Sequence, residues 1–146
     1  MIPFMLLIVS LIMFRALGAL GFDMFGSWPD AARYALAVLF TFTAASRLTP
    51  MREDLIRMVP RWLHYPRALV YLTGALELAG AIGLLIPALQ HLAGLGLAAL
   101  LVAMFPANVN AAQNDVTLRG RSPTPLWQRL PMQLVFLGLT WWATQY

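Results

Sequence analysis

Five long apolar runs alternate with short polar segments along the chain, at residues 2–20, 31–48, 69–86, 92–112 and 130–146. A transmembrane helix needs about 20 consecutive, mostly apolar residues. The runs lack the alternation of apolar and polar positions that marks the strand of a membrane barrel. Because hydrocarbon tolerates only structures that satisfy their own backbone hydrogen bonds, the runs predict helices. We therefore expect an all-α integral membrane helical bundle with about five spans.

Arginine is confined mainly to alternate connecting segments. Segments 50–67 and 113–129 each carry several arginines, whereas 21–30 holds two aspartates and no base, and 87–91 has no formal charge. Positively charged loops tend to stay on the cytoplasmic side of a membrane. The pattern predicts a multi-pass protein of the cell membrane, with the N-terminus and the Arg-rich loops cytoplasmic and the C-terminus outside.

A short helix is predicted in the segment after the second run, over about residues 50–63. Thr49 can cap it, and Pro50 suits the first helical position. Apolar side chains recur there at spacings of three and four, at Met51, Leu55, Met58 and Trp62. Such a stripe suits a helix that lies along the membrane interface, although the segment also fits an ordinary solvated connector.

The composition agrees with a lipid environment. The 146 residues are 60% hydrophobic and 11% charged, whereas soluble domains average about a quarter charged residues; mean hydropathy is +0.71. The positive charge consists of arginines scattered between apolar runs, which favours topology signals over a nucleic-acid site. The absence of cysteine excludes disulfides, thiolate nucleophiles and Cys-ligated metals. The first run carries its only charge, Arg15, after the apolar stretch, so we interpret it as a retained helix and not a cleaved signal peptide.

Glu77 lies near the middle of the third run, where a carboxylate costs about 3 kcal/mol on insertion scales. It could serve as a proton carrier, a cofactor contact or a ligand anchor, or as an interhelical hydrogen bond that fixes the bundle. Burial in lipid alone would neutralise it, whereas a nearby arginine would keep it ionised. Arg15 could pair with it or extend outward to the interface. Small residues in this run predict close helix packing, at Gly74, Ala75, Ala79, Gly80 and Gly83.

Four further polar residues are expected near the cytoplasmic side. Arg47 closes the second run, Asn108 and Asn110 close the fourth, and Gln133 begins the fifth. The asparagines could satisfy backbone freed by Pro106 or contact a headgroup. Arg47 could anchor its helix at the interface or bind a ligand. Together with Glu77, we take Arg47, Asn108 and Gln133 as ligand-binding candidates.

No metal site and no complete catalytic group is predicted. His64 and His91 are isolated and fall at opposite faces in the expected topology, and no His or carboxylate pair has ligand spacing. Serine has no base nearby that would support acyl transfer. The sequence therefore favours a protein that is not an enzyme.

Four segments in order resemble the DoxX family of small bacterial membrane proteins, from about Tyr34 to the C-terminus. They are TP at 49–50 with RMVP following at 57–60, YLTGALELAGAIGLLIP at 71–87, FPANVNAA at 105–112 and TPLWQRLPMQ at 124–133. The resemblance implies one membrane domain, 1–146, with a DoxX-like four-helix core at 31–146 and an additional N-terminal helix at 1–20. Members of that family often have a His-Phe pair where this chain has Arg47-Leu48.

The resemblance also implies an accessory or assembly subunit linked to a membrane redox system, without complete catalytic machinery. One alternative is a binding protein or oxidoreductase for quinone or another lipophilic ligand, with a pocket around Glu77. Another is a self-associating scaffold that uses the stripe of Ala75, Ala79 and Gly83. The expected partners are the lipid bilayer, a membrane redox complex and a second copy of the chain; no nucleic-acid partner and no bound cofactor other than quinone are expected.

Overall fold

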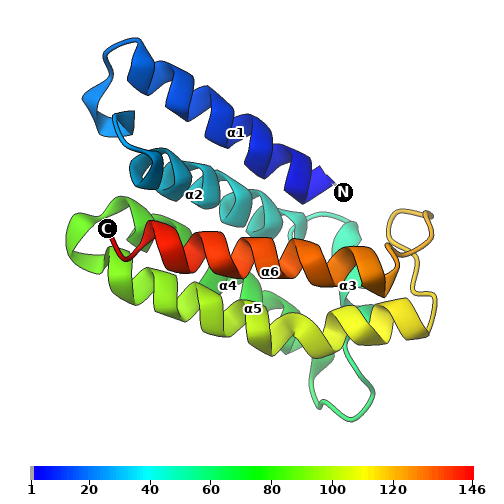
Figure 1. The fold of residues 1–146 in the computed structure, drawn as a ribbon. Coiled ribbons are helices and arrows are strands. Elements are labelled where there is room, and N and C mark those ends of the chain that lie inside the picture. The colour runs from blue at the N-terminus through cyan, green and yellow to red at the C-terminus, as the bar shows by residue number, and fades with distance from the viewer. Residues whose placement is uncertain (1) are drawn as a thin grey trace.

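The computed structural model describes residues 2–146; its long helices lie side by side at different tilts, and one short helix runs across them (Figure 1). The structure is all-α, and within the described residues it contains no strand. The α-helices are α1 (Ile2–Ala19), α2 (Trp28–Ser46), α3 (Met51–Met58), α4 (Pro66–Leu85), α5 (Gln90–Gln113) and α6 (Leu126–Ala143), with 3-10 turns η1 (Asp23–Phe25) and η2 (Pro87–Leu89). Each of the five apolar runs thus forms one long helix, which confirms the predicted helical bundle.

Local signals determine where α2 begins. The Ser27 hydroxyl accepts a hydrogen bond from the backbone N–H of Asp30 at 3.2 Å, and Pro29 lies in the first turn. A serine cap satisfies one of the N–H groups that the first turn of a helix leaves without a partner. The helix therefore starts three residues before the apolar run begins.

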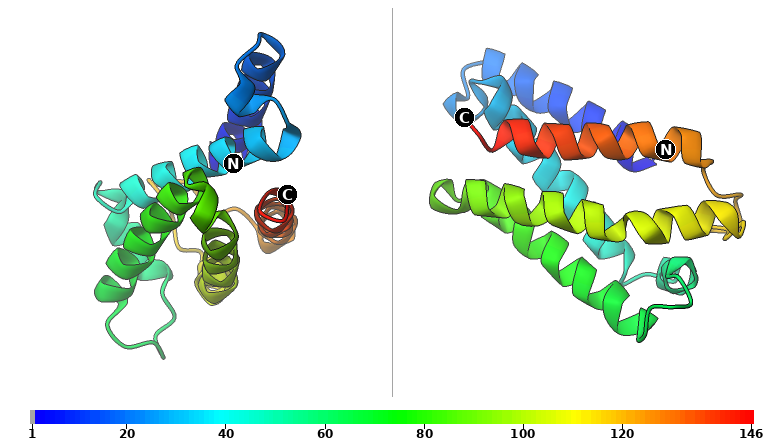
Figure 2. Two further views of the ribbon diagram at one scale, coloured as in Figure 1. Left: turned by 90° about the vertical axis from the view of Figure 1, so that its left-hand side faces the viewer. Right: turned by 60° about the horizontal axis from the view of Figure 1, so that its bottom comes forward.

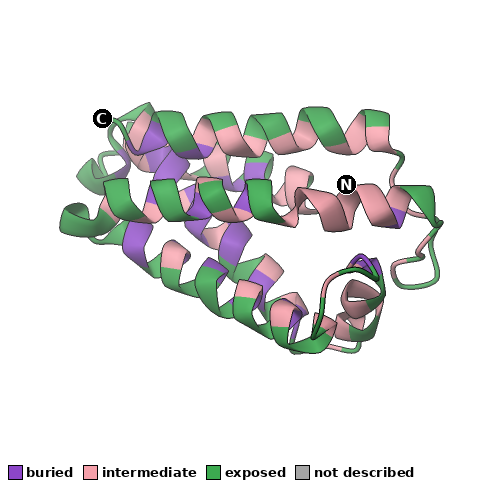
Figure 3. Cartoon of the chain, turned by 90° about the horizontal axis from the view of Figure 1, so that it is seen from below, coloured by how far each residue is buried: buried purple, intermediate pink, exposed green. Residues whose placement is uncertain are grey.

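The central element is α2, which packs against α1, α4 and α6. Its buried side chains point in several directions, and Leu36 and Phe40 belong to a core that also includes Leu84 of α4 and Leu97 of α5. The outward faces of the helices are exposed, whereas the buried residues lie where the helices meet (Figure 3). Two further views show α1 on the outside of the bundle (Figure 2).

The short helix α3 is shorter than predicted. Its last residue is Met58, Val59 is extended, and Trp62 lies beyond it with 67% of its surface exposed. The cause is Pro60, because proline disfavours helical backbone at the preceding residue. The helix therefore ends at Met58 and not at about residue 63, and α3 packs against α4 and α5.

Three helical segments are long and apolar enough to cross a membrane, namely Ile2–Ala19, Pro66–Leu85 and Pro87–Gln113. Helices α2 and α6 are not among them. Each carries polar side chains in addition to its apolar ones, such as Asp30 and Arg33 in α2 and Arg129 and Gln133 in α6.

Candidate functional site

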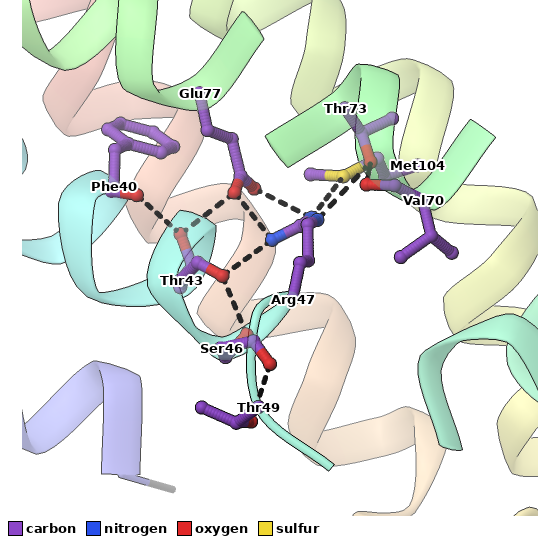
Figure 4. Close-up of polar contacts among 9 residues, drawn as sticks. All are labelled: Phe40, Thr43, Ser46, Arg47, Thr49, Val70, Thr73, Glu77 and Met104. Carbon is purple, nitrogen blue, oxygen red and sulfur yellow. Dashed lines mark hydrogen bonds and ion pairs between the residues drawn. The ribbon is translucent and has the colours of Figure 1, made fainter. Parts of the chain in front are cut away.

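The centre of the site is a buried ion pair between α2 and α4. Arg47 directly follows the last residue of α2, and Glu77 lies in the middle of α4. Arg47 Nη1 is 2.6 Å from Glu77 Oε2, and Nη2 is 3.1 Å from Oε1, so the two side chains meet in a two-pronged contact. Glu77 is only 2% exposed and Arg47 8%. Figure 4 shows the pair and the polar groups around it.

Every N–H of the Arg47 guanidinium has an acceptor. Besides the two bonds to Glu77, Nη1 donates to the Thr43 carbonyl at 2.6 Å, Nε to Thr73 Oγ1 at 3.3 Å, and Nη2 to Met104 Sδ at 3.6 Å. A guanidinium has five N–H donors, and five acceptors are present. We call Arg47 and the four residues that accept from it the charged cluster, namely Arg47, Thr43, Thr73, Glu77 and Met104. The cluster joins α2, α4 and α5.

The carboxylate of Glu77 has a third potential donor in Thr43. The Thr43 hydroxyl lies 3.1 Å from both Glu77 Oε2 and the Phe40 carbonyl. Because a hydroxyl has one proton, it donates to one of these acceptors at a time. Thr43 can therefore keep a hydrogen bond whether or not Glu77 is present.

Gly74 provides the space that the Arg47 side chain occupies. A Cβ atom at Gly74 would lie 2.5 Å from Arg47 Cδ. Gly80 and Gly83 instead face α5, where added Cβ atoms would lie 2.5 Å from Leu97 Cδ2 and 2.8 Å from Ala93 Cβ. The predicted packing residues thus serve different neighbours, and two of them, Ala75 and Ala79, are exposed.

A second group of polar side chains joins α5 and α6. Asn108 Nδ2 donates to Gln133 Oε1 at 3.0 Å, and Gln133 Nε2 donates to the Leu101 carbonyl at 2.5 Å. Arg129 Nη1 donates to Asn108 Oδ1 at 3.1 Å. We call Asn108, Gln133 and Arg129 the amide cluster. The carbonyl that Pro106 leaves without its helical donor is that of Val102, whereas Gln133 bonds to the carbonyl of Leu101.

The four ligand-binding candidates fall into these two separate groups. Arg47 and Glu77 bond to each other, Asn108 and Gln133 bond to each other, and no hydrogen bond joins the two pairs. Two apolar grooves, of about 420 and 390 Å³, lie elsewhere, between α1 and α2 and along the outer side of α4 and α5. None of the four candidates lines either groove.

Several polar contacts were not predicted from the sequence. Arg33 is buried and donates from Nη1 to the carbonyls of Ala143 at 2.9 Å and Tyr146 at 2.6 Å, which stabilises the C-terminal end of α6. It also pairs with Asp30. The only signal in the sequence was a charge within the start of an apolar run. Arg15 lies over the Trp28 ring, 5.4 Å from its centroid, and makes no bond to Glu77.

Helix α3 is attached to its surroundings by backbone and side-chain bonds. Asn110 Nδ2 donates to the Met58 carbonyl at 2.9 Å, and the Arg119 backbone N–H donates to Asp54 Oδ2 at 2.9 Å. The Arg119 N–H, with a smaller contribution from the neighbouring Arg57, holds the pKa of the Asp54 carboxyl below its ordinary value. Asn110 thus satisfies a carbonyl at the end of α3, a role different from the one expected for it near Pro106.

The two histidines lie at opposite ends of the bundle. His64 is in the connection between α3 and α4, and His91 Nδ1 lies 3.5 Å from the Thr144 carbonyl at the other end. Within residues 2–146, no three His, Asp or Glu side chains are placed to share a metal ion.

The fold defines a class of all-α helical bundles in which three helices are apolar enough for a membrane and a buried ion pair joins the central helix to its neighbour. Residues 36–145 match the family described as Domain of unknown function (DUF8561), and the chain belongs to this family. The predicted membership of the DoxX family is therefore wrong: the four segments that suggested it are short and rich in residues common to many membrane helices. No curated protein and no solved structure matches the chain.

Proposed function

We propose that the protein is an integral membrane bundle whose five long helices all cross the bilayer. The observation that carries this proposal is the exposure of its most apolar helices. Only 11% of the residues in the apolar window of α1 and 33% of those in α4 are buried within the chain. Large side chains such as Ile12, at 62% exposed, and Leu72, at 54%, would face water in a soluble protein. Lipid is a better solvent for such surfaces.

The position of α2 explains how a less apolar helix can also cross. Because α2 packs against α1, α4 and α6, its arginines Arg33 and Arg47 are buried in protein and would not meet acyl chains. Ionisable residues within membranes characteristically face the bundle interior and pair with one another, as Arg47 does with Glu77. We propose the same for Arg33, whose guanidinium donates to the carbonyls of Ala143 and Tyr146 and pairs with Asp30.

The proposed orientation follows from the charges at the two ends. The connection between α3 and α4, and the connection between α5 and α6, lie at the same end of the bundle as the start of α1 (Figure 1). These connections carry Arg61, Arg119 and Arg121, and the positive-inside rule places them in the cytoplasm. The C-terminus then lies outside.

Labelling of single cysteines tests this topology directly, because the chain has no cysteine of its own. Met24 in η1 and Thr117 in the α5–α6 connection are both exposed and lie at opposite ends. A membrane-impermeant maleimide should label Met24→Cys in intact spheroplasts and Thr117→Cys only after the membrane is permeabilised. The reverse pattern, or equal labelling of both in intact cells, would contradict the orientation.

For its biochemical role, we propose an accessory or assembly protein. In this protein the charged cluster stabilises the packing of the helices. The support is that the donors of Arg47 are occupied by groups of the same chain, so the cluster already has its partners without a ligand. Fully satisfied polar networks rigidify and specify a packed structure. The pair would then hold the central helix α2 against α4.

Mass spectrometry of lipid extracts distinguishes this role from ligand binding. Purified protein and its Glu77→Gln variant should release the same set of lipids, each in proportion to the surrounding membrane. A lipophilic compound, such as a quinone, that is enriched with the original protein and lost with the variant would instead support a ligand site at Glu77.

Self-association is a second proposal, supported by the outer face of α4. Ala75 and Ala79 are exposed there, and Ala79 borders the apolar groove shared with α5. Small residues let membrane helices approach closely. Replacing both alanines by leucine should reduce cross-linked dimers in detergent, whereas Ala19→Leu, an exposed position on α1, should not. Gly83 is unsuitable for this test because it contacts Ala93 within the chain.

A further inference from the structure

Two arginine-bearing segments that are far apart in the sequence form one surface through α3. Asp54 of α3 accepts the backbone N–H of Arg119, and Asn110 of α5 donates to the carbonyl that ends α3. On the other side, Arg67 of α4 pairs with Glu53 of α3 at 3.5 Å. We call this surface the arginine face; it comprises Arg52, Arg57, Arg61, Arg67, Arg119 and Arg121.

The arginine face has more cations than the nearby acids can pair. Glu53 contacts Arg52 and Arg67, and Asp54 contacts Arg57. Within residues 2–146, the side chains of Arg61, Arg119 and Arg121 make no ion pair, and all three are exposed. Three guanidinium groups therefore remain available for an external anion.

Exposed aromatic side chains lie at the same end of the bundle. Trp62 and Tyr65 lie in the connection from α3 to α4 and are 67% and 80% exposed, and Trp127 in the first turn of α6 is 72% exposed. Tryptophan and tyrosine favour the headgroup region of a bilayer. Nucleic acid or an acidic protein would account for the arginines, but a lipid surface accounts for both the arginines and the aromatic rings.

We propose that the arginine face binds the phosphate groups of anionic phospholipids, with Arg61, Arg119 and Arg121 as the principal contacts. Guanidinium groups bind phosphate through charge-assisted hydrogen bonds. Each basic residue near an anionic membrane surface strengthens attachment about fivefold. This inference rests on the proposed membrane location, and it adds a preference for one class of lipid at one end of the protein.

Competition between two lipids tests the proposal. The full chain is reconstituted in vesicles of equal parts phosphatidylglycerol and phosphatidylcholine, and the lipids that remain bound after gentle release are counted by native mass spectrometry. The protein should retain phosphatidylglycerol in preference, and 0.5 M salt should weaken this preference. The variant Arg61→Gln/Arg119→Gln/Arg121→Gln should lose it, by about fivefold for each charge removed.

The matched control is Arg61→Lys/Arg119→Lys/Arg121→Lys, which keeps the charge and should keep most of the preference. Equal retention of phosphatidylglycerol by the original protein and the glutamine variant would overturn the inference. Carbonate extraction from vesicles of phosphatidylcholine alone separates the two proposals. Failure of the original protein to stay with these vesicles refutes the membrane location, whereas retention without phosphatidylglycerol preference refutes only lipid selectivity.

Discussion

The charged cluster and the amide cluster perform similar tasks in different surroundings. In the charged cluster, a buried Arg47 and Glu77 join α2 to α4, and each polar atom of the pair has a partner. In the amide cluster, the neutral side chains of Asn108 and Gln133 join α5 to α6 and are only half-buried. Arg129, its single charge, lies nearer the bundle end.

The two clusters differ in how much free energy of unfolding is lost when one polar partner is removed. Removing one member of a buried ion pair leaves an uncompensated charge, a change that destabilises proteins by about 3–5 kcal/mol. Losing a neutral hydrogen bond between membrane helices changes the free energy of unfolding by about 0.6 kcal/mol on average. The charged cluster should therefore be the more sensitive of the two.

The largest expected effect comes from removing a single partner of the ion pair. Arg47→Met leaves Glu77 buried without its cation, and we expect the free energy of unfolding to fall by about 3–5 kcal/mol. Chemical denaturation in lipid–detergent micelles, followed by tryptophan fluorescence, measures this change. A loss below about 1 kcal/mol would place the pair among weak, solvent-screened contacts and remove the contrast between the clusters.

A smaller effect is expected from filling the space beside the arginine. The Cβ of Gly74→Ala would meet Arg47 Cδ, and overpacking typically costs about 1–3 kcal/mol. Gly96→Ala is the control, because a Cβ there has no neighbour within 4 Å and alanine favours a helix. The same denaturation assay should show loss of stability for the first variant and none for the second.

The amide cluster should respond more weakly. Gln133→Leu removes the donors to Leu101 and the acceptor of Asn108, and we expect a loss of about 1 kcal/mol. Gln128→Leu, in the same helix, removes a side chain for which the structure gives no hydrogen bond. If Gln133→Leu destabilised the protein as much as Arg47→Met does, the ranking of the two clusters would be wrong.

The smallest effect concerns Asp54 at the arginine face, outside both clusters. The pKa of the Asp54 carboxyl is lowered in the folded state. The ionised carboxylate therefore stabilises the contact with the Arg119 N–H fully at pH values above the ordinary aspartate pKa of about 3.9, and this stabilisation is lost as the pH falls further. Amide exchange at Arg119, corrected for its intrinsic rate, should therefore be slow at pH 6 and become faster as the pH falls below the ordinary pKa of an aspartate. In Asp54→Asn it should be faster at pH 6 as well. Protection that is unchanged in both conditions would contradict the assignment.

The helices themselves were largely predictable from the sequence. Long apolar runs without alternation specify helices by periodicity and length alone, and Pro60 could have indicated the early end of α3. The side chains that stabilise helix ends were harder to find. Arg33 meets carbonyls more than 100 residues later in the chain, at Ala143 and Tyr146, and local sequence contains no sign of such a partner.

The candidate site was predictable in part. The position of Glu77 within an apolar run predicted an inward-facing carboxyl group, and a nearby arginine that keeps it ionised was one possibility beside neutralisation by burial in lipid. Which arginine it would be depends on how α2 and α4 pack, so that Arg47, first considered as an interface anchor, proved to be the partner. Gly74 was predicted to pack against a neighbouring helix, and the atoms nearest to it belong to the Arg47 side chain.

The most direct test of the account replaces both members of the pair by apolar residues of similar size. In Arg47→Met/Glu77→Leu, the Thr43 and Thr73 hydroxyls still have the Phe40 and Val70 carbonyls as acceptors. A well-packed apolar pair can match a buried ion pair in stability. We therefore expect the double variant to recover most of what Arg47→Met loses. A double variant less stable than either single variant would contradict the proposal that the charges serve only to satisfy each other and fasten α2 to α4.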